Sequence, residues 1–194
     1  MTDQKNSTSG FSMIELVAVL AVMFVMFAIG VPSFVRAYRT YQLDNTASQV
    51  EGILKATRSS AIRLNTPVNC VIQVVAGQTH MWADSNNDGI EQSTEKQILL
   101  SGNVNLVQAA IVPNTGGLAA AIGVPVLTAT SPLSGVADTF DARGAANPAA
   151  PAVYVLYVGN TAIPTAGYRA VVLMPSGSLQ VWSADSAGNW NQPR

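Results

Sequence analysis

The chain has 194 residues and a net charge of −1, and only 11% of its residues are charged. So little basic character gives no general reason to expect nucleic acid as a partner. Cys70 is the only cysteine, which excludes an intrachain disulfide, and His80 is the only histidine, so no transition-metal site is expected. No nucleophile-elbow pattern accompanies them, and we expect neither an enzyme nor a cofactor.

A polar segment, residues 1–10, is followed by 21 residues, 11–31, that carry a single charge, Glu15. A helix over this stretch is roughly 31 Å long, about the thickness of a bilayer core. The apolar run is longer than that of a signal peptide, and no Ala-x-Ala-like cleavage site follows it. We therefore expect an uncleaved membrane-spanning helix.

Glu15 is the residue that does not fit this helix, because a charge near a bilayer centre costs at least ~2.5 kcal/mol. No Lys, Arg or His lies in residues 11–35 to pair with it. If the chain were cut after Gly10, the new α-amino group of Phe11 could pair with Glu15 of a neighbouring copy shifted by about one turn. The pattern predicts lateral packing of helices in a membrane or filament.

We expect this helix to continue past Pro32 and to end near Asn65, because Pro67 disfavours helix at the residue before it. Apolar and small residues recur at alternating spacings of four and three, which predicts one buried stripe that packs on a sheet. The stripe consists of Leu43, Ala47, Val50, Leu54, Thr57, Ala61 and Leu64.

Strand patterns dominate after the helix, at residues 68–75, 79–83, 96–100, 153–158, 168–174 and 178–183. The first two are expected to form a hairpin. The 41 residues 97–137 carry no charge, and their Gly and Pro content predicts short strands and loops. The tail, residues 187–194, is expected to fray. The fold class is α+β: a long N-terminal helix packed on an antiparallel sheet of five to eight strands.

The segment from Asp84 to Glu95 fits a calcium-loop pattern, with oxygen donors at Asp84, Asn86, Asp88 and Glu95 and with Gly89 at the bend. Strands rather than paired helices flank it, and Asp, Asn and Gly also form plain turns. Both interpretations stay open, and we prefer the turn.

The segment Gly10-Phe11-Ser12-Met13-Ile14-Glu15 resembles the class III leader site of type IV pilins and type II secretion pseudopilins. The resemblance implies that prepilin peptidase cuts between Gly10 and Phe11 and that the new N-terminal Phe11 is methylated. It also implies that Glu15 helps to register subunits during assembly.

Three further segments, residues 58–63, 82–89 and 140–144, resemble the GspH/FimT family of minor pilins and minor pseudopilins. Residues 106–136 match no family segment and are interpreted as an insert. The resemblance implies three parts: a prepilin leader at residues 1–10, a transmembrane half-helix at residues 11–35, and an extracytoplasmic pilin-like globular domain at residues 36–194.

The resemblance implies a minor pilin-like structural subunit, single-pass in the inner membrane and then part of a pilus. Its expected partners are prepilin peptidase and other pilin or pseudopilin subunits. The alternative is a type II secretion minor pseudopilin. Some FimT-like pilins bind DNA through a Gly-Arg-x-Arg segment, but residues 177–180 here read Gly-Ser-Leu-Gln, so DNA binding is not expected.

Overall fold

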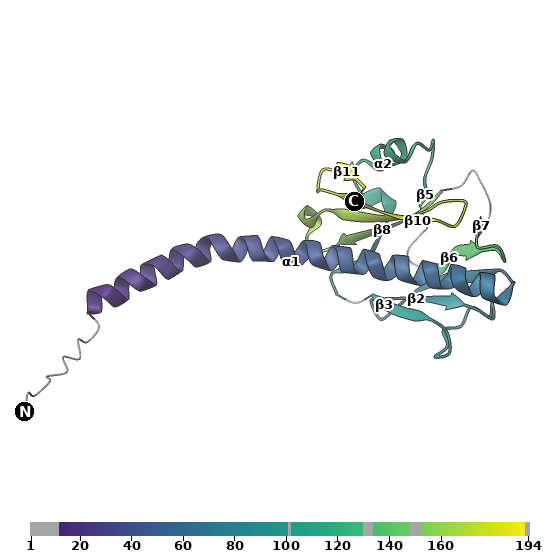
Figure 1. Ribbon diagram of the computed structural model, residues 1–194, viewed down its shortest axis with the longest axis horizontal. Coiled ribbons are helices and arrows are strands. Elements are labelled where there is room, and N and C mark those ends of the chain that lie inside the picture. The colour runs from purple at the N-terminus through teal and green to yellow at the C-terminus, as the bar shows by residue number, and fades with distance from the viewer. Residues whose placement is uncertain (1–11, 101, 130–133, 148–152, 193–194) are drawn as a thin grey trace, which may run out of the picture. The chain divides into compact units, whose positions relative to one another are not determined.

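The computed structural model describes residues 12–100, 102–129, 134–147 and 153–192 (Figure 1). It divides into two compact units, residues 1–38 and 39–194. One helix, α1 (Met13–Leu64, 52 residues), runs through Pro32 and belongs to both units. The predicted helix and its end next to Asn65 are confirmed, and so is the α+β fold class.

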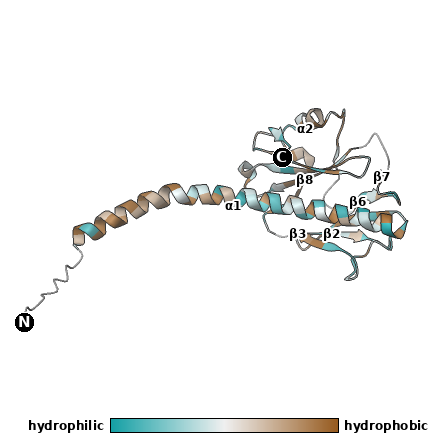
Figure 2. Cartoon of the chain, in the orientation of Figure 1, coloured by the Kyte–Doolittle hydropathy of each residue, from teal (hydrophilic) through white to brown (hydrophobic). Residues whose placement is uncertain are grey.

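In the first unit α1 is predominantly apolar, and Figure 2 shows most of it in brown and tan with a few pale and teal turns. Its most apolar 18-residue window has a mean hydropathy of 2.7, and none of that window is buried. Phe27, for example, is 61% exposed. The helix is long enough and apolar enough to cross a membrane.

The second unit contains two sheets rather than the single sheet expected. The first sheet, sheet A, has the order β3-β2-β1-β6-β7, and each neighbouring pair is antiparallel. The predicted hairpin is confirmed as β1 and β2. Its strands are β1 (Val68–Val75), β2 (Gln78–Asp84), β3 (Gln97–Leu100), β6 (Ser134–Phe140) and β7 (Ala146–Asn147).

The second sheet, sheet B, has the order β11-β10-β9-β8-β4, with the short β5 (Thr128–Ala129) parallel to β8. The described residues thus hold eleven strands, more than expected, because short pieces such as β5 and β11 add to the longer ones. The tail also forms the two-residue strand β11 instead of fraying there. The main strands are β4 (Val104–Val107), β8 (Tyr154–Asn160), β9 (Tyr168–Leu173), β10 (Leu179–Ala184) and β11 (Trp190–Asn191).

The part of α1 in the second unit supplies the centre of the core. The predicted stripe is buried there except for Leu64, which is 42% exposed because it stands in the last turn. Residues of both sheets share one apolar cluster with this stripe, among them Ile72 of β1 and Leu156 of β8. Each such large side chain contributes roughly 1.5–3 kcal/mol by its burial.

The insert forms a helix where only strands and loops were expected. A 3₁₀ turn, η1 (Ala109–Ile111), and α2 (Thr115–Ile122) pack on the face of sheet B that is turned away from α1. Asn114 caps α2 by accepting a hydrogen bond from the Gly117 N–H, and Gly123 ends it in a left-handed conformation. The two caps were the sequence signal for this helix. The signal was missed because Gly116 and Gly117 disfavour a helix.

Arg58 on α1 ties the two sheets together beyond their apolar faces. Its Nε donates to the Gly144 carbonyl after β6 (2.9 Å), and its Nη2 contacts the Ser176 carbonyl in the β9–β10 turn (3.4 Å). The two loops also meet directly, because the Ala146 N–H donates to the Pro175 carbonyl (3.1 Å). The junction leaves no room at Gly177 for a side chain.

Gly177→Ala should therefore destabilise the protein more than Gly77→Ala does. Both glycines have a left-handed φ, +77° and +79°, but a Cβ at Gly177 would overlap the Gly144 carbonyl, whereas one at Gly77 meets open space. We expect a loss of about 1 kcal/mol at Gly77 and about 3 kcal/mol at Gly177. Urea unfolding of the full chain in detergent, followed by tryptophan fluorescence, measures both. Equal losses would contradict the crowded junction.

Candidate functional site

Glu15 lies in the first turn of α1. The Ser12 carbonyl accepts hydrogen bonds from the N–H groups of Glu15 (3.0 Å) and Leu16 (3.1 Å), so the helix begins at this point. A carboxylate in a first turn interacts favourably with the helix dipole. The Glu15 side chain is exposed and makes no hydrogen bond or ion pair with the rest of residues 12–38. The carboxyl group is thus accessible to a group outside the chain.

Gly10 and Phe11 lie outside the described residues. Cleavage between them and methylation of Phe11 stay predictions from the sequence.

The Asp84 loop is organised by its own hydrogen bonds. The Asp84 carboxylate is 2% exposed and accepts the N–H groups of Asp88 (3.1 Å) and Gly89 (3.0 Å). Asp88 accepts the side-chain amides of Asn86 (2.8 Å) and Gln92 (2.5 Å). This is the bonding of a compact turn that closes on itself.

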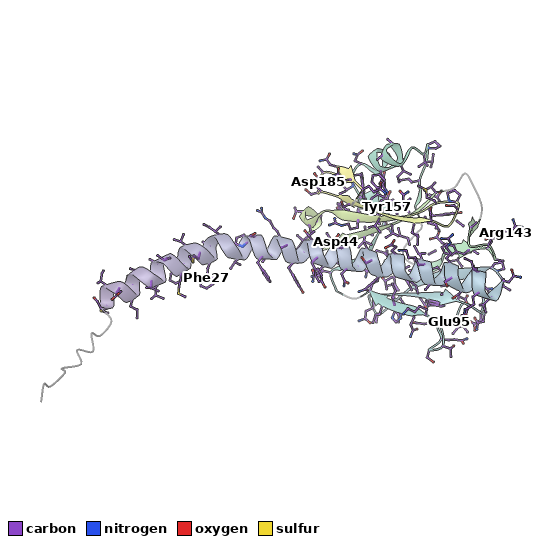
Figure 3. The ribbon with its side chains drawn as sticks, viewed as in Figure 1. Phe27, Asp44, Glu95, Arg143, Tyr157 and Asp185 are labelled. Atoms are coloured by element: carbon purple, nitrogen blue, oxygen red, sulfur yellow. The ribbon has the colours of Figure 1, made fainter. Side chains whose placement is uncertain are left out.

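Glu95, which is labelled in Figure 3, bonds back to the start of the same loop. Its Oε1 accepts hydrogen bonds from the N–H and hydroxyl groups of Ser85 (2.8 and 3.2 Å), while its Oε2 is buried without a partner in the described structure. Across the described parts of the chain, no group of three or more His, Cys, Asp or Glu side chains is placed to hold a metal ion. Calcium binding stays a prediction, and the bonds observed favour the structural turn.

The same loop covers one face of sheet A. Glu91 of the loop pairs with Nδ1 of His80 (2.9 Å), on the face of the sheet turned away from α1.

Trp82 lies on the same face of sheet A and is 1% exposed. Trp182 is buried as well, and the indole N–H of Trp190 donates to the Asn114 carbonyl (3.0 Å). The three tryptophans therefore serve packing and do not form one exposed binding patch.

Arg169, near the segment compared with DNA-binding pilins, has a structural partner. Its Nε donates to Asp44 on α1 (2.6 Å), its Nη1 donates to the Tyr168 carbonyl (2.9 Å), and its side chain is 9% exposed. Sequence reasoning did not anticipate this bond, because Asp44 and Arg169 are far apart in the chain. A buried, paired arginine is not available to a phosphate backbone.

Sequence reasoning also missed Asp138, a buried carboxyl group in β6 that lies beside Cys70. The only sequence signal was a charged residue in an otherwise strand-like run.

Comparison of the chain with models of known families, with curated proteins and with solved structures finds no match.

Asp84→Ala should destabilise the protein to the same extent with and without calcium. The substitution leaves the N–H groups of Asp88 and Gly89 without their acceptor, which costs about 1–3 kcal/mol in total. Thermal unfolding of the full chain in detergent, with EDTA or with excess CaCl₂, measures this. A melting temperature that rises by several degrees with calcium in the wild type, and not in Asp84→Ala, would establish a calcium site instead.

Proposed function

We propose that the chain is a minor pilin-like structural subunit of a type IV pilus or a related filament, cleaved by prepilin peptidase and assembled through its N-terminal helix. The observation that carries the proposal is α1. One continuous helix has a first half that is apolar and exposed on every side and a second half that forms the core of a β domain.

The two halves suit two successive environments. An isolated helix that is apolar on all sides is stable in lipid, where it would hold the subunit in the inner membrane as a single-pass protein with an extracytoplasmic C-terminal domain. In a filament, packing against the corresponding helices of other subunits would bury the same apolar surface of α1. A β domain built onto the same helix would then face outward.

Glu15 would set the register in which neighbouring helices pack. A carboxylate in lipid is costly unless a partner satisfies it, and the described first unit provides none. Cleavage after Gly10 would create an α-amino group at Phe11, and the amine of one subunit could pair with Glu15 of the next. Prepilin peptidase and other pilin or pseudopilin subunits are therefore the proposed partners.

A type II secretion minor pseudopilin is the alternative, because the same helix and the same leader would serve a periplasmic pseudopilus. A DNA-uptake pilin is less well supported. The net charge is −1, and Arg169 is bound to Asp44. A chain with a net charge of −1 offers little of the positive charge that phosphate binding uses.

Gly10→Val should block processing, because a small residue is required at the cleavage site. The full-length precursor should then accumulate in the membrane, while Ser7→Val, a leader substitution away from the site, should be processed normally. Intact-mass spectrometry of the wild type should show a chain that begins at methylated Phe11. A mature protein that begins at Met1, or after residue 30, would refute the pilin assignment.

Glu15→Ala and the isosteric Glu15→Gln should both be processed and folded normally but should reach filaments at well below a tenth of the wild-type level. The reason is the loss of a cation–carboxylate pair in a low-dielectric core. Quantitative immunoblots of sheared filaments, from a strain without the wild-type copy, measure the effect. Ser12→Ala is the control and should assemble normally. Normal assembly of Glu15→Gln would remove the registering role.

A further inference from the structure

Asp138 faces the core because of an irregularity in strand pairing. β1 and β6 shift register between Cys70 and Val71, so that Cys70 stands opposite Asp138 while Val71 stands opposite Val136. The extra residue on β6, Ala137, turns Asp138 to the same side as Cys70, which belongs to the main core cluster. Without this shift the side chain of Asp138 would point away from the core, whereas with it the carboxyl group lies inside the core.

The Asp138 carboxyl group has no partner there. The residue is 5% exposed, and both of its carboxyl oxygens are buried without a hydrogen bond in the described structure. Its neighbours are the Cys70 thiol, which stands opposite it on β1, and the Tyr154 hydroxyl of β8, which interacts with it electrostatically, with the Thr57 hydroxyl of α1 bonded to the thiol. None of these is a cation. Because an unpaired buried carboxylate is strongly disfavoured, such a group takes up a proton.

The pKa values of the cluster agree with this geometry. Burial raises the pKa of Asp138 to about 8. Burial and the neighbouring Asp138 together raise the pKa of Cys70 to about 12, and the same two causes raise the pKa of Tyr154. Near neutral pH, therefore, the whole cluster is uncharged and the thiol is unreactive.

We propose that Asp138 is a proton-linked lock on the packing of α1 against β1 and β6. With the proton bound, the neutral carboxyl group stays sealed under α1 beside Cys70. When the proton is lost, the carboxylate draws water into the core, and the contact between α1 and the two strands opens. The inference stands on the core of residues 39–194 and does not depend on filament assembly.

The direction of the pH effect follows from linkage. The folded state holds the proton up to about pH 8, whereas the unfolded chain releases it near the ordinary pKa of an aspartate, 3.8. Between these values the folded state binds one proton more than the unfolded state. The contribution of Asp138 to stability is thus complete below about pH 4. Between about pH 4 and about pH 8 the folding equilibrium constant falls by up to tenfold for each pH unit.

Cys70 provides a local readout, because it is the only cysteine, is fully buried and lies opposite Asp138. The rate of maleimide labelling of the full chain in detergent is compared between the wild type and Asp138→Asn from pH 6 to pH 8. Because Asp138 also raises the pKa of Cys70, the labelling rate of each unfolded protein is measured at the same pH and divided out. We expect the wild-type rate, divided by the Asp138→Asn rate, to rise up to tenfold per pH unit.

Asp141→Asn is the matched control, since Asp141 lies three residues away and accepts hydrogen bonds from the N–H groups of Arg143 and Ala145. It should follow the wild type at every pH. A ratio for Asp138→Asn that does not change with pH would overturn the proposal.

Infrared titration of Glu15→Gln, which lacks the carboxyl group of the apolar helix, tests the lock even if Asp138→Asn does not fold. A protonated carboxyl band should persist at pH 6.5, where exposed carboxyl groups are ionised, and should disappear as the pH passes about 8. Absence of that band at pH 6.5 would equally overturn the lock.

Discussion

The two sheets formed by the described residues of the β domain share no strand, so α1 is the element that joins their apolar faces into one core. Its buried stripe contacts both sheets, and polar bonds reinforce the packing at either end. Asp44 binds Arg169 of β9, and Arg58 binds the carbonyl groups of two loops, one from each sheet. The β domain therefore cannot be complete without a helix that begins in a quite different, fully apolar segment.

This dependence links the fold to the proposed function. The apolar segment and the helical segment in the core of the β domain belong to one helix, α1. A subunit drawn out of a membrane by its helix would carry its β domain with it.

Sequence patterns predicted what depends on local periodicity. The end of α1 and strands such as β1 and β9 could be placed from apolar spacing and from Pro67. The second sheet could not, because its pairing of β4 with β8 joins segments about fifty residues apart, and no local pattern encodes such a contact. The helix α2 was missed because its glycines oppose the helix that its caps define.

The candidate sites divide in the same way. Glu15 could be identified from sequence, since a lone charge in an apolar run is visible without coordinates. Asp138 could not, because its burial results from a one-residue shift in register between β1 and β6. The bond between Asp44 and Arg169 likewise depends on how the chain folds back on α1.

The central claim, that α1 packs against neighbouring helices with Glu15 close to a neighbour's N-terminus, is tested most directly by cross-linking inside assembled filaments. A photo-reactive residue is placed at Leu16, the filaments are sheared and irradiated, and the products are mapped by mass spectrometry. A filament built through this helix predicts cross-links to the first turn of a neighbouring subunit. Cross-links confined to lipid, or the absence of the chain from filaments of the system that its neighbouring genes encode, would contradict it.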